Sequence, residues 1–168
     1  MGIPIAFSQA VFFIGFLTSQ PELITRAHSD LVNIFGPISE TTLPIAFDHS
    51  SYYQEEMGAP LYKHWVFFSN LQSPNTISST KLETNRIECL YSNESGRKIN
   101  LDPGFLTPHN VVLLSTKNYA HRIPLQNGIY AELELIYTQG HYQKLPWTYP
   151  DYLLSTLQNS FQKNRLNH

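Results

Sequence analysis

Residues 11–17 read VFFIGFL, a run in which Gly15 is the only residue without an apolar side chain. Apolar and polar residues do not alternate here, and phenylalanine, valine and isoleucine favour extended backbone. A run of this kind is typical of a strand that is buried on both faces. The segment therefore predicts a sheet that is covered by other elements.

A helix is predicted to follow this strand directly. Ser19 and Glu22 have the spacing of a capping box, and Pro21 would lie in the first turn, where proline is tolerated. Gly36 and Pro37 would stop the helix. Its buried face is expected to carry Leu23, Ala27, Leu31 and Ile34.

The next elements are two strands, at 42–47 and 64–68, and a second helix that ends near Tyr91. Apolar side chains at Ile77, Leu82, Cys89 and Leu90 predict the buried stripe of this helix. Cys89 would then be buried and inert. Asp102-Pro103-Gly104 has the composition of a turn, with Asp102 as its capping residue.

The second half of the chain is predicted to be rich in strands, at 98–101, 111–115, 121–125, 129–137 and 142–145. Pro150 marks the start of a terminal helix whose inner face would carry Leu153, Leu157 and Phe161. The segment 145–152, LPWTYPDY, is interpreted as an aromatic clamp beneath this helix. Stacking of a base on these rings is the alternative.

A hairpin is predicted at Asn127-Gly128, because a tight primed turn needs positive φ at both central residues. With a two-residue turn, His121 would lie opposite Glu134. Tyr130, Glu132 and Glu134 would share a face with His121, either as an ordinary polar pair on a solvated face or as part of a site.

The order of these elements predicts a single α+β domain over residues 1–168. The sheet would be mostly antiparallel, with helices packed on one face, and a ferredoxin-like core is one form of this arrangement.

Composition limits the classes of function. Eleven basic and thirteen acidic residues give a formal charge of −2, which predicts no broad nucleic-acid surface. The single cysteine, Cys89, cannot form an internal disulfide and favours a reducing, cytoplasmic location. The apolar N-terminus is broken at Ser8 and Gln9, so no membrane segment is expected.

Several longer segments together resemble a small prokaryotic family catalogued as domain of unknown function 4416. They are FIGFLTS, FDHSSYYQEEMG, INLDPGFLTPHNVVLLSTKNYAHRI, GIYAELELIY and LPWTYPDY. The resemblance spans nearly the whole chain and implies no activity. Some names in that family mention GTP binding, but the chain has neither a GxxxxGK[ST] phosphate loop nor an NKxD-like stretch.

The segment 115–123, STKNYAHRI, is the first candidate site. Lys117, His121 and Arg122 supply donors of the kind that hold a phosphate or carboxylate, and they follow directly after a predicted strand. A carboxylate beside His121 would fix the tautomer of the imidazole, as a general base requires, and Glu132, Glu134 or Asp48 would supply the base. A solvated loop is the alternative interpretation.

The other candidates are Asp48, as a base or metal ligand, and Tyr52, Tyr130 and Asp102, as ligand-binding residues. Divalent metal is one option for a cofactor. Asp48, Glu56, Asp102 and Glu132 would suit Mg²⁺ or Mn²⁺, and adding His49 or His121 would admit Zn²⁺ or Fe²⁺.

Two functions remain open from the sequence. The first is binding or turnover of a small anionic, phosphorylated or nucleotide-like ligand, with Lys117, His121 and Arg122 as its anion site. The second is a non-catalytic module that presents an aromatic surface to a protein or RNA partner.

Overall fold

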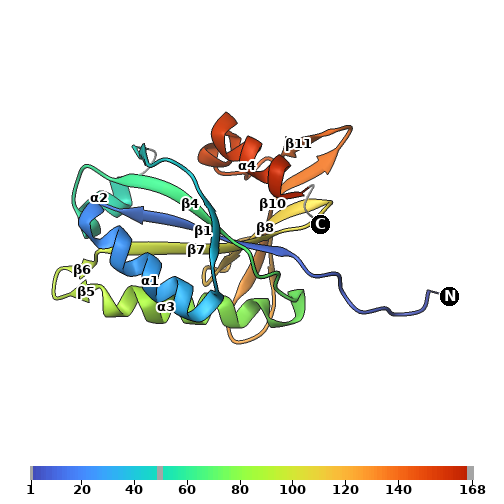
Figure 1. Ribbon diagram of the computed structural model, residues 1–168, viewed down its shortest axis with the longest axis horizontal. Helices are drawn as coiled ribbons and strands as arrows, with labels where there is room; N and C mark the ends of the chain where they lie inside the picture. Colours follow the sequence, from blue (N-terminus) through green and yellow to red (C-terminus); the bar gives the residue numbers. More distant parts are fainter. Residues whose placement is uncertain (1, 49–50, 166–168) are drawn as a thin grey trace.

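Strand β1 (Val11–Thr18) lies inside the sheet, and all eight of its residues are buried. The computed structural model describes residues 2–48 and 51–165. In it β1 pairs with β4 (Tyr62–Phe68) on one side and with β7 (Ile99–Leu106) on the other, both antiparallel (Figure 1). The prediction of a strand buried on both faces is confirmed.

The described residues form a nine-stranded sheet whose main path runs β11-β10-β8-β7-β1-β4-β2. All of its pairings are antiparallel, and β3 and β9 pair with β4 and β10 beside this path. The remaining strands are β2 (Ile38–Thr41), β3 (Ile45–Ala46), β8 (Asn110–Ser115), β9 (Arg122–Pro124), β10 (Tyr130–Thr138), β11 (His141–Lys144) and the small pair β5 (Ser92–Asn93) and β6 (Gly96–Arg97).

Helices cover both faces of this sheet (Figure 1). Two of them, α1 (Ile24–Phe35) and α3 (Ile77–Leu90), lie on one face, whereas α4 (Ser155–Arg165) lies on the other. Helix α2 (Ser51–Met57) lies at one end. Short 3₁₀ turns, η1 (Pro21–Leu23), η2 (Pro74–Thr76) and η3 (Pro150–Leu153), precede α1, α3 and α4.

The predicted class, a single α+β domain with an antiparallel sheet, is confirmed. The order β1-α1-β2-β4-α3-β7, with spatial strand order β7-β1-β4-β2, has the connectivity expected of a ferredoxin-like core. Both helices of this part share a face, as predicted. Helix α4 departs from the prediction because the added strands β8 to β11 offer a second apolar surface on the opposite face.

Alternate side chains of β1 pack into two separate hydrophobic cores, one on each face of the sheet. Phe12 and Phe16 pack with Leu31 and the rest of α1, while Phe13 packs with Phe161 of α4. Period-two alternation explains this division, because successive side chains of a strand point to opposite faces.

Two details of the first half differ from the prediction. Ser19 donates its hydroxyl hydrogen bond to the carbonyl of Met57 instead of capping a helix, and Ile34 is 46% exposed. Of the predicted strand at 42–47 only residues 45–46 are extended, as β3; β2 ends before it at Thr41, and the stretch between them contains Pro44, which has no N–H to donate.

Helix α3 is present, but its predicted buried stripe is wrong except at Ile77. Leu82 is 41% and Leu90 70% exposed, and Cys89 is exposed as well. The helix instead buries a largely polar face, composed of Ile77, Ser78, Thr80, Lys81, Thr84, Ile87 and Glu88.

The predicted turn at Asp102-Pro103-Gly104 is also wrong, because these residues lie within β7. Pro103 is accommodated because β8 pairs with β7 only from Gly104 onward, so no β8 residue is paired with the proline. Gly104 is needed for close approach: a Cβ there would lie 2.5 Å from Phe13 Cζ and 2.6 Å from the Val112 carbonyl oxygen.

The hairpin turn is confirmed, with positive φ at Asn127 and Gly128. Its predicted strand register is wrong by one residue, because Leu125 donates to the Ile129 carbonyl beyond the turn. Arg122, and not Ile123, therefore lies opposite Glu132.

We predict that Gly104→Ala lowers the free energy of unfolding by about 1–3 kcal/mol, because the added methyl group overlaps a ring and a backbone oxygen that are both buried. Chemical denaturation would measure the change. Gly2→Ala is the control, since nothing lies within 4 Å of a Cβ at that position. Equal stability of the two variants would contradict the packing described here.

Candidate functional site

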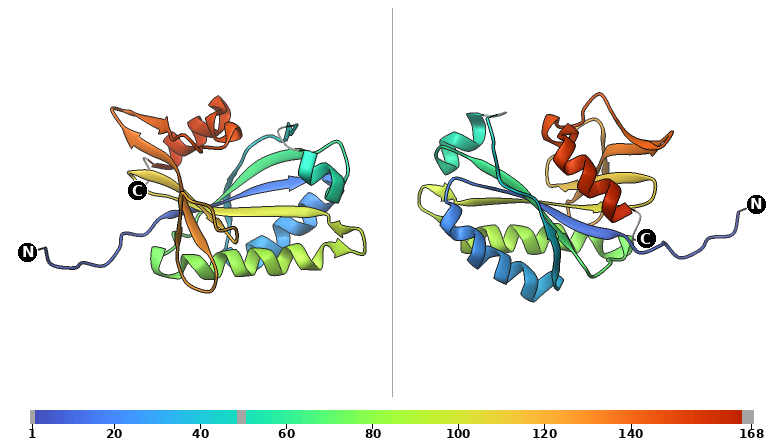
Figure 2. Two further views of the ribbon diagram at one scale, coloured as in Figure 1. Left: turned by 180° about the vertical axis from the view of Figure 1, so that it is seen from behind. Right: turned by 45° about the horizontal axis from the view of Figure 1, so that its top comes forward.

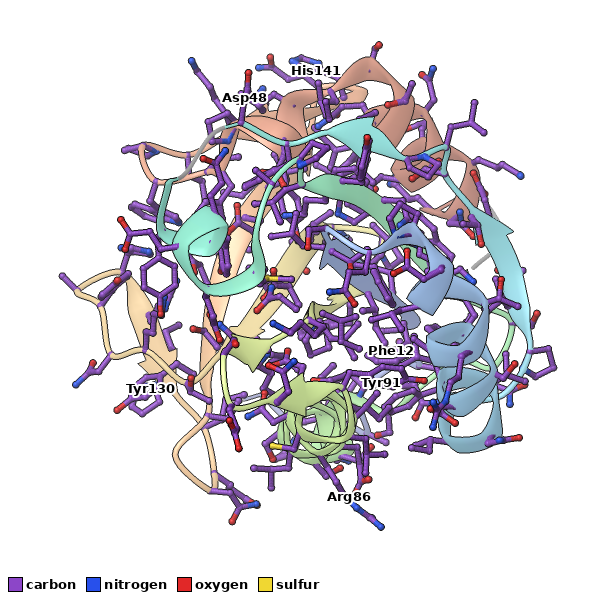
Figure 3. The ribbon with its side chains drawn as sticks, turned by 90° about the vertical axis from the view of Figure 1, so that its left-hand side faces the viewer. Phe12, Asp48, Arg86, Tyr91, Tyr130 and His141 are labelled. Atoms are coloured by element: carbon purple, nitrogen blue, oxygen red, sulfur yellow. The ribbon has the colours of Figure 1, made fainter. Side chains whose placement is uncertain are left out.

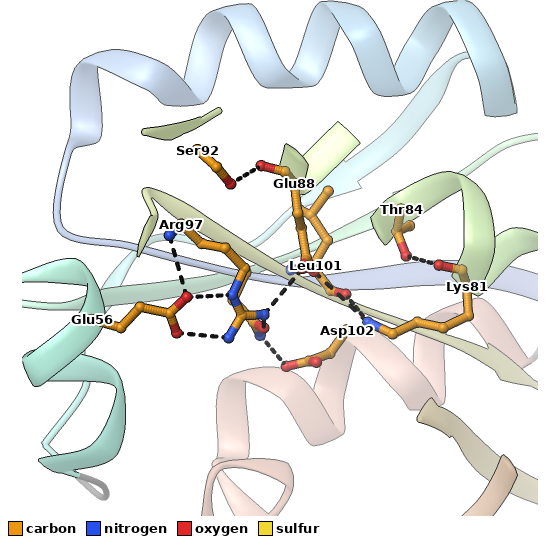
Figure 4. A network of polar contacts seen from close by, with 9 residues as sticks. Glu56, Lys81, Thr84, Glu88, Ser92, Arg97, Leu101 and Asp102 are labelled. Carbon is orange, nitrogen blue, oxygen red and sulfur yellow. Dashed lines mark hydrogen bonds and ion pairs between the residues drawn. The ribbon is translucent and has the colours of Figure 1, made fainter. Parts of the chain in front are cut away.

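The sheet opens into a gap between β7 and β8, and side chains of α3 fill the edge of that gap. The Leu101 N–H donates to Glu88 Oε1 at 2.7 Å, and the Leu101 carbonyl accepts from Lys81 Nζ at 2.8 Å (Figure 4). In a continuous sheet both backbone groups would pair with the next strand. Side chains of α3 thus take the place of the next strand as partners of Leu101, which explains why Lys81 and Glu88 are buried.

Arg97 joins this edge to α2. Its Nε and Nη2 donate to the two carboxylate oxygens of Glu56, each at 2.8 Å, and its Nη1 donates to Glu88 and Asn100 (Figure 4). The hydrogen bonds from Arg97 lower the pKa of Glu56 below its ordinary value, whereas burial raises that of Glu88. Helix α2 is thereby held beside the gap.

A cavity of about 580 Å³ occupies this region. The walls of the cavity come from α2, β7, the end of β8 with the loop that follows it, and η3. Figure 2 shows α2 at one end of the sheet. The described residues that line it are Leu17, Phe47, Tyr52, Tyr53, Lys63, Lys81, Asn85, Arg97, Asn100, Asp102, Leu113, Leu114, Ser115, Thr116, Lys117, Tyr119, Arg122, Tyr149, Pro150, Asp151 and Tyr152.

Basic and tyrosine side chains are concentrated here. Five of the eleven Lys and Arg residues of the chain line the cavity, together with five of its ten tyrosines and two acidic residues. The chain as a whole has a formal charge of −2, so the wall of the cavity differs in sign from the whole molecule. Basic groups in a cavity wall attract anions where no carboxylate neutralises them.

Arg122 lines the cavity, but its guanidinium is fully engaged. Its Nε and Nη2 lie 2.6 Å from Glu132 Oε2, Nη1 donates to Ser115 Oγ and to the Lys117 carbonyl, and Nη2 donates to Tyr149. The side chain is 2% exposed. Arg122 therefore holds the loop after β8 in place.

The other basic side chains differ in how many donors remain free. Lys63 Nζ lies 2.5 Å from Asp151 Oδ2, and Lys81 gives one hydrogen bond to Leu101. Lys117 is exposed, and no carboxylate among the described residues lies within 4 Å of its Nζ, which sits 5.0 Å from the centre of the Tyr52 ring. Lys117 is therefore the basic residue whose ammonium group is available to bind a ligand, and Lys81 lines the same cavity.

Of the predicted ligand-binding residues, Lys117, Arg122, Tyr52 and Asp102 all line this cavity. Tyr130 is not among the lining residues, and Figure 3 shows it at the periphery of β10. Asp48 is exposed, lies on the segment before α2 and does not line the cavity either (Figure 3). His49 lies outside the described residues.

A carboxylate does contact the imidazole of His121, but it is Glu132 and not Glu134, with 2.6 Å between His121 Nε2 and Glu132 Oε1. His121 also stacks on Trp147 at 5.1 Å between ring centres. Neither His121 nor Glu132 lines the cavity. They stand behind Arg122, and the predicted pairing of His121 with Glu134 is wrong because of the shifted hairpin register.

The acidic face of β10 is buried and not solvated. Glu132 is 1% and Glu134 0% exposed. The segment before η3 covers them: Trp147 Nε1 donates to the Leu133 carbonyl, and the Tyr149 N–H donates to Glu134 Oε2. Burial, followed by the charge of Glu132, raises the pKa of Glu134 to about 8. The segment is the clamp that the sequence predicted.

No group of three or more His, Cys, Asp or Glu side chains within 2–48 and 51–165 is placed to hold a metal ion. Over the same ranges, no helix combines the length and apolar character needed to cross a membrane.

The comparisons with known proteins identify a family. The family model described as Domain of unknown function (DUF4416) matches residues 8–168, and the chain belongs to this family. No curated protein and no solved structure matches it.

Sequence reasoning missed Lys63, Lys81, Arg97 and Asp151 as members of the site. One signal was available: Lys81, Thr84, Asn85 and Glu88 recur at three- and four-residue spacing, which places them on one face of a helix. The prediction of the buried stripe used only apolar side chains and therefore did not include these residues.

We predict that Glu88→Ala destabilises the fold by about 3–5 kcal/mol, because it leaves the Leu101 N–H and two basic groups without their buried acceptor. Hydrogen exchange at the Leu101 amide should accelerate more than exchange elsewhere in β7. Glu83→Ala, on a more exposed part of the same helix, is the control and should change stability by no more than about 0.5 kcal/mol. Unchanged exchange at Leu101 would contradict the assignment.

The raised pKa of Glu134 predicts that the free energy of unfolding depends on pH. Its folded pKa is above the unfolded value, so the folded state binds the extra proton and stability falls as the pH rises from about 4.5 to about 8. Glutamine does not ionise, so Glu134→Gln should not lose stability in this way. The free energy of unfolding of the variant, relative to that of the wild type, should increase across that window by at most about 1.4 kcal/mol per pH unit. Thermal unfolding at several pH values tests this, with Glu83→Gln as the control; parallel profiles for wild type and Glu134→Gln would refute it.

Proposed function

We propose that the cavity beside the β7–β8 gap binds a small anionic ligand, phosphorylated or nucleotide-like, in a cytoplasmic protein. The supporting observation is that five of eleven basic residues line one cavity in a chain of negative formal charge. Four of these five residues are paired with carboxylates, whereas no carboxylate among the described residues lies within 4 Å of Lys117 Nζ, so Lys117 is the cation that is open to an anion.

The position of the free donors supports the same proposal. Lys117 presents its ammonium group at the exposed side of the cavity, and Ser115 and Thr116 beside it add hydroxyl groups. The Lys117 N–H donates to Ser115 Oγ, and Arg122 binds the Lys117 carbonyl, so the loop is held in one conformation. A loop held in this way loses little conformational entropy when a ligand binds.

His121 and Glu132 fit a supporting role in this proposal. Glu132 bridges the imidazole of His121 and the guanidinium of Arg122, with 2.6 Å to each. Because neither residue lines the cavity, the geometry favours binding over turnover. The pair orients Arg122, which in turn orients the loop that carries Lys117.

Thermal unfolding against a panel of inorganic phosphate, sugar phosphates, nucleotides and short RNA tests the proposal. A ligand at about 100 times its Kd stabilises the folded protein by roughly 2.7 kcal/mol. We predict that Lys117→Ala weakens anion binding about tenfold, since a charge-assisted hydrogen bond contributes about 1.5–3 kcal/mol.

Lys144→Ala is the matched control, because Lys144 is an exposed lysine on β11 outside the cavity lining. Stabilisation by RNA alone, equal in both lysine variants, would instead favour the interaction module with an aromatic surface. Equal loss of anion binding in the two variants would indicate a nonspecific effect of charge and count against the cavity.

A further inference from the structure

Among the residues that line the cavity, Tyr152, Lys63 and Asp151 are buried, and we call the part of the lining that they form the inner end. It contains a hydroxyl group whose hydrogen bond is not made. Tyr152 is 1% exposed and lines the cavity, and its ring packs against Phe161 and Trp65. Its Oη has no hydrogen-bond partner among the residues that the structure describes. Buried polar groups in folded proteins are rarely left in this state, so the hydroxyl points to a group that occupies the cavity.

The groups around this hydroxyl are both donors and acceptors. Lys63 and Asp151, which are 7% and 2% exposed, line the same inner end. Asp102 also lines the cavity, and one of its oxygens accepts a hydrogen bond from Asn100 at 2.8 Å. Burial, with the charges of Glu134, Asp151 and Asp102, raises the pKa of Tyr152, so the hydroxyl is neutral and can donate.

The two ends of the cavity therefore suit different chemical groups. Lys117 at the exposed end has no carboxylate within reach among the described residues and suits an anion. At the inner end the charge of Asp151 is matched by Lys63, but Asp102 has no basic group within 4 Å among the described residues and would repel a second anion. A purely apolar group there would leave the Tyr152 hydroxyl unpaired. A hydroxyl group of the ligand meets both conditions, because it donates to a carboxylate and accepts from Tyr152 or Lys63.

We infer that the ligand is a monophosphate ester of a polyhydroxylated compound, such as a sugar phosphate, with its phosphate at Lys117 and its hydroxyl groups at Tyr152. This inference rests on the proposed function and narrows it to one class of ligand. A cavity of about 580 Å³ accommodates a compound of this size. A second phosphate group would place further negative charge toward Asp102 and Asp151, so diphosphates and triphosphates fit less well.

Calorimetric titration of the full chain with inorganic phosphate, ribose 5-phosphate and AMP tests the inference. We expect ribose 5-phosphate to bind at least about tenfold more tightly than inorganic phosphate, because sites built to bind hydroxyl groups discriminate strongly against compounds that lack them. Tyr152→Phe should abolish most of this gain and leave the affinity for inorganic phosphate unchanged. It removes no hydrogen bond within the described residues, so the variant should fold with an unchanged or higher Tm.

Tyr142→Phe is the matched control. Tyr142 is a buried tyrosine of the same core cluster, but its hydroxyl bonds the Phe161 carbonyl and it does not line the cavity. It should bind ribose 5-phosphate as the wild type does.

The other outcomes separate this inference from the proposed function. If inorganic phosphate and ribose 5-phosphate bind equally, or if Tyr152→Phe leaves both affinities unchanged, the inner end holds only solvent and the inference is wrong while anion binding stands. Tighter binding of AMP than of ribose 5-phosphate, insensitive to Tyr152→Phe, would identify a nucleotide and overturn the sugar assignment. Absence of binding by all three compounds would overturn the proposed function itself.

Discussion

The hydrogen bonds from Glu88 and Lys81 to the backbone of Leu101 are the interaction on which the site depends. They supply the partners that β8 would supply in a continuous sheet. Because these backbone groups are buried, the sheet can separate at this point only if other groups pair with them. Once α3 provides these groups, β8 is free to diverge from β7, and the space between them becomes the cavity.

Pro103 and Gly104 set the point at which the strands separate. Gly104 allows the backbone of Val112 to approach closely, so β7 and β8 pair from this residue toward Leu106. In the other direction Pro103 has no N–H to offer a neighbouring strand. Asp102-Pro103-Gly104 has the composition of a turn, but here it marks the point within β7 at which pairing with β8 ends. Pairing of β7 with β1 continues through Asp102 to Ile99.

The charged residues around the cavity fall into two groups with different roles. Arg97 and Arg122 are matched by Glu56, Glu88 and Glu132 and hold α2 and the loop after β8. Buried ion pairs of this kind contribute little net stability, but they fix the relative positions of the elements that they join. Lys117 stands apart from these pairs, and this difference supports its role toward a ligand.

The sequence by itself determined the elements whose signals are local: the doubly buried strand β1, the turn at Asn127-Gly128, the α+β class and the presence of a carboxylate beside His121. Four of the five predicted ligand-binding residues, namely Lys117, Arg122, Tyr52 and Asp102, line one cavity, whereas the fifth, Tyr130, and the predicted base Asp48 do not. Only the tertiary structure decided which face of α3 is buried, which residues of β7 pair with β8, and that Lys63, Lys81 and Asp151 join the same cavity. The physical reason is that a backbone group or a charged side chain can pair with any suitable group that the fold places beside it. The partner of the Leu101 N–H is Glu88, which lies 13 residues away on a helix and not on the next strand.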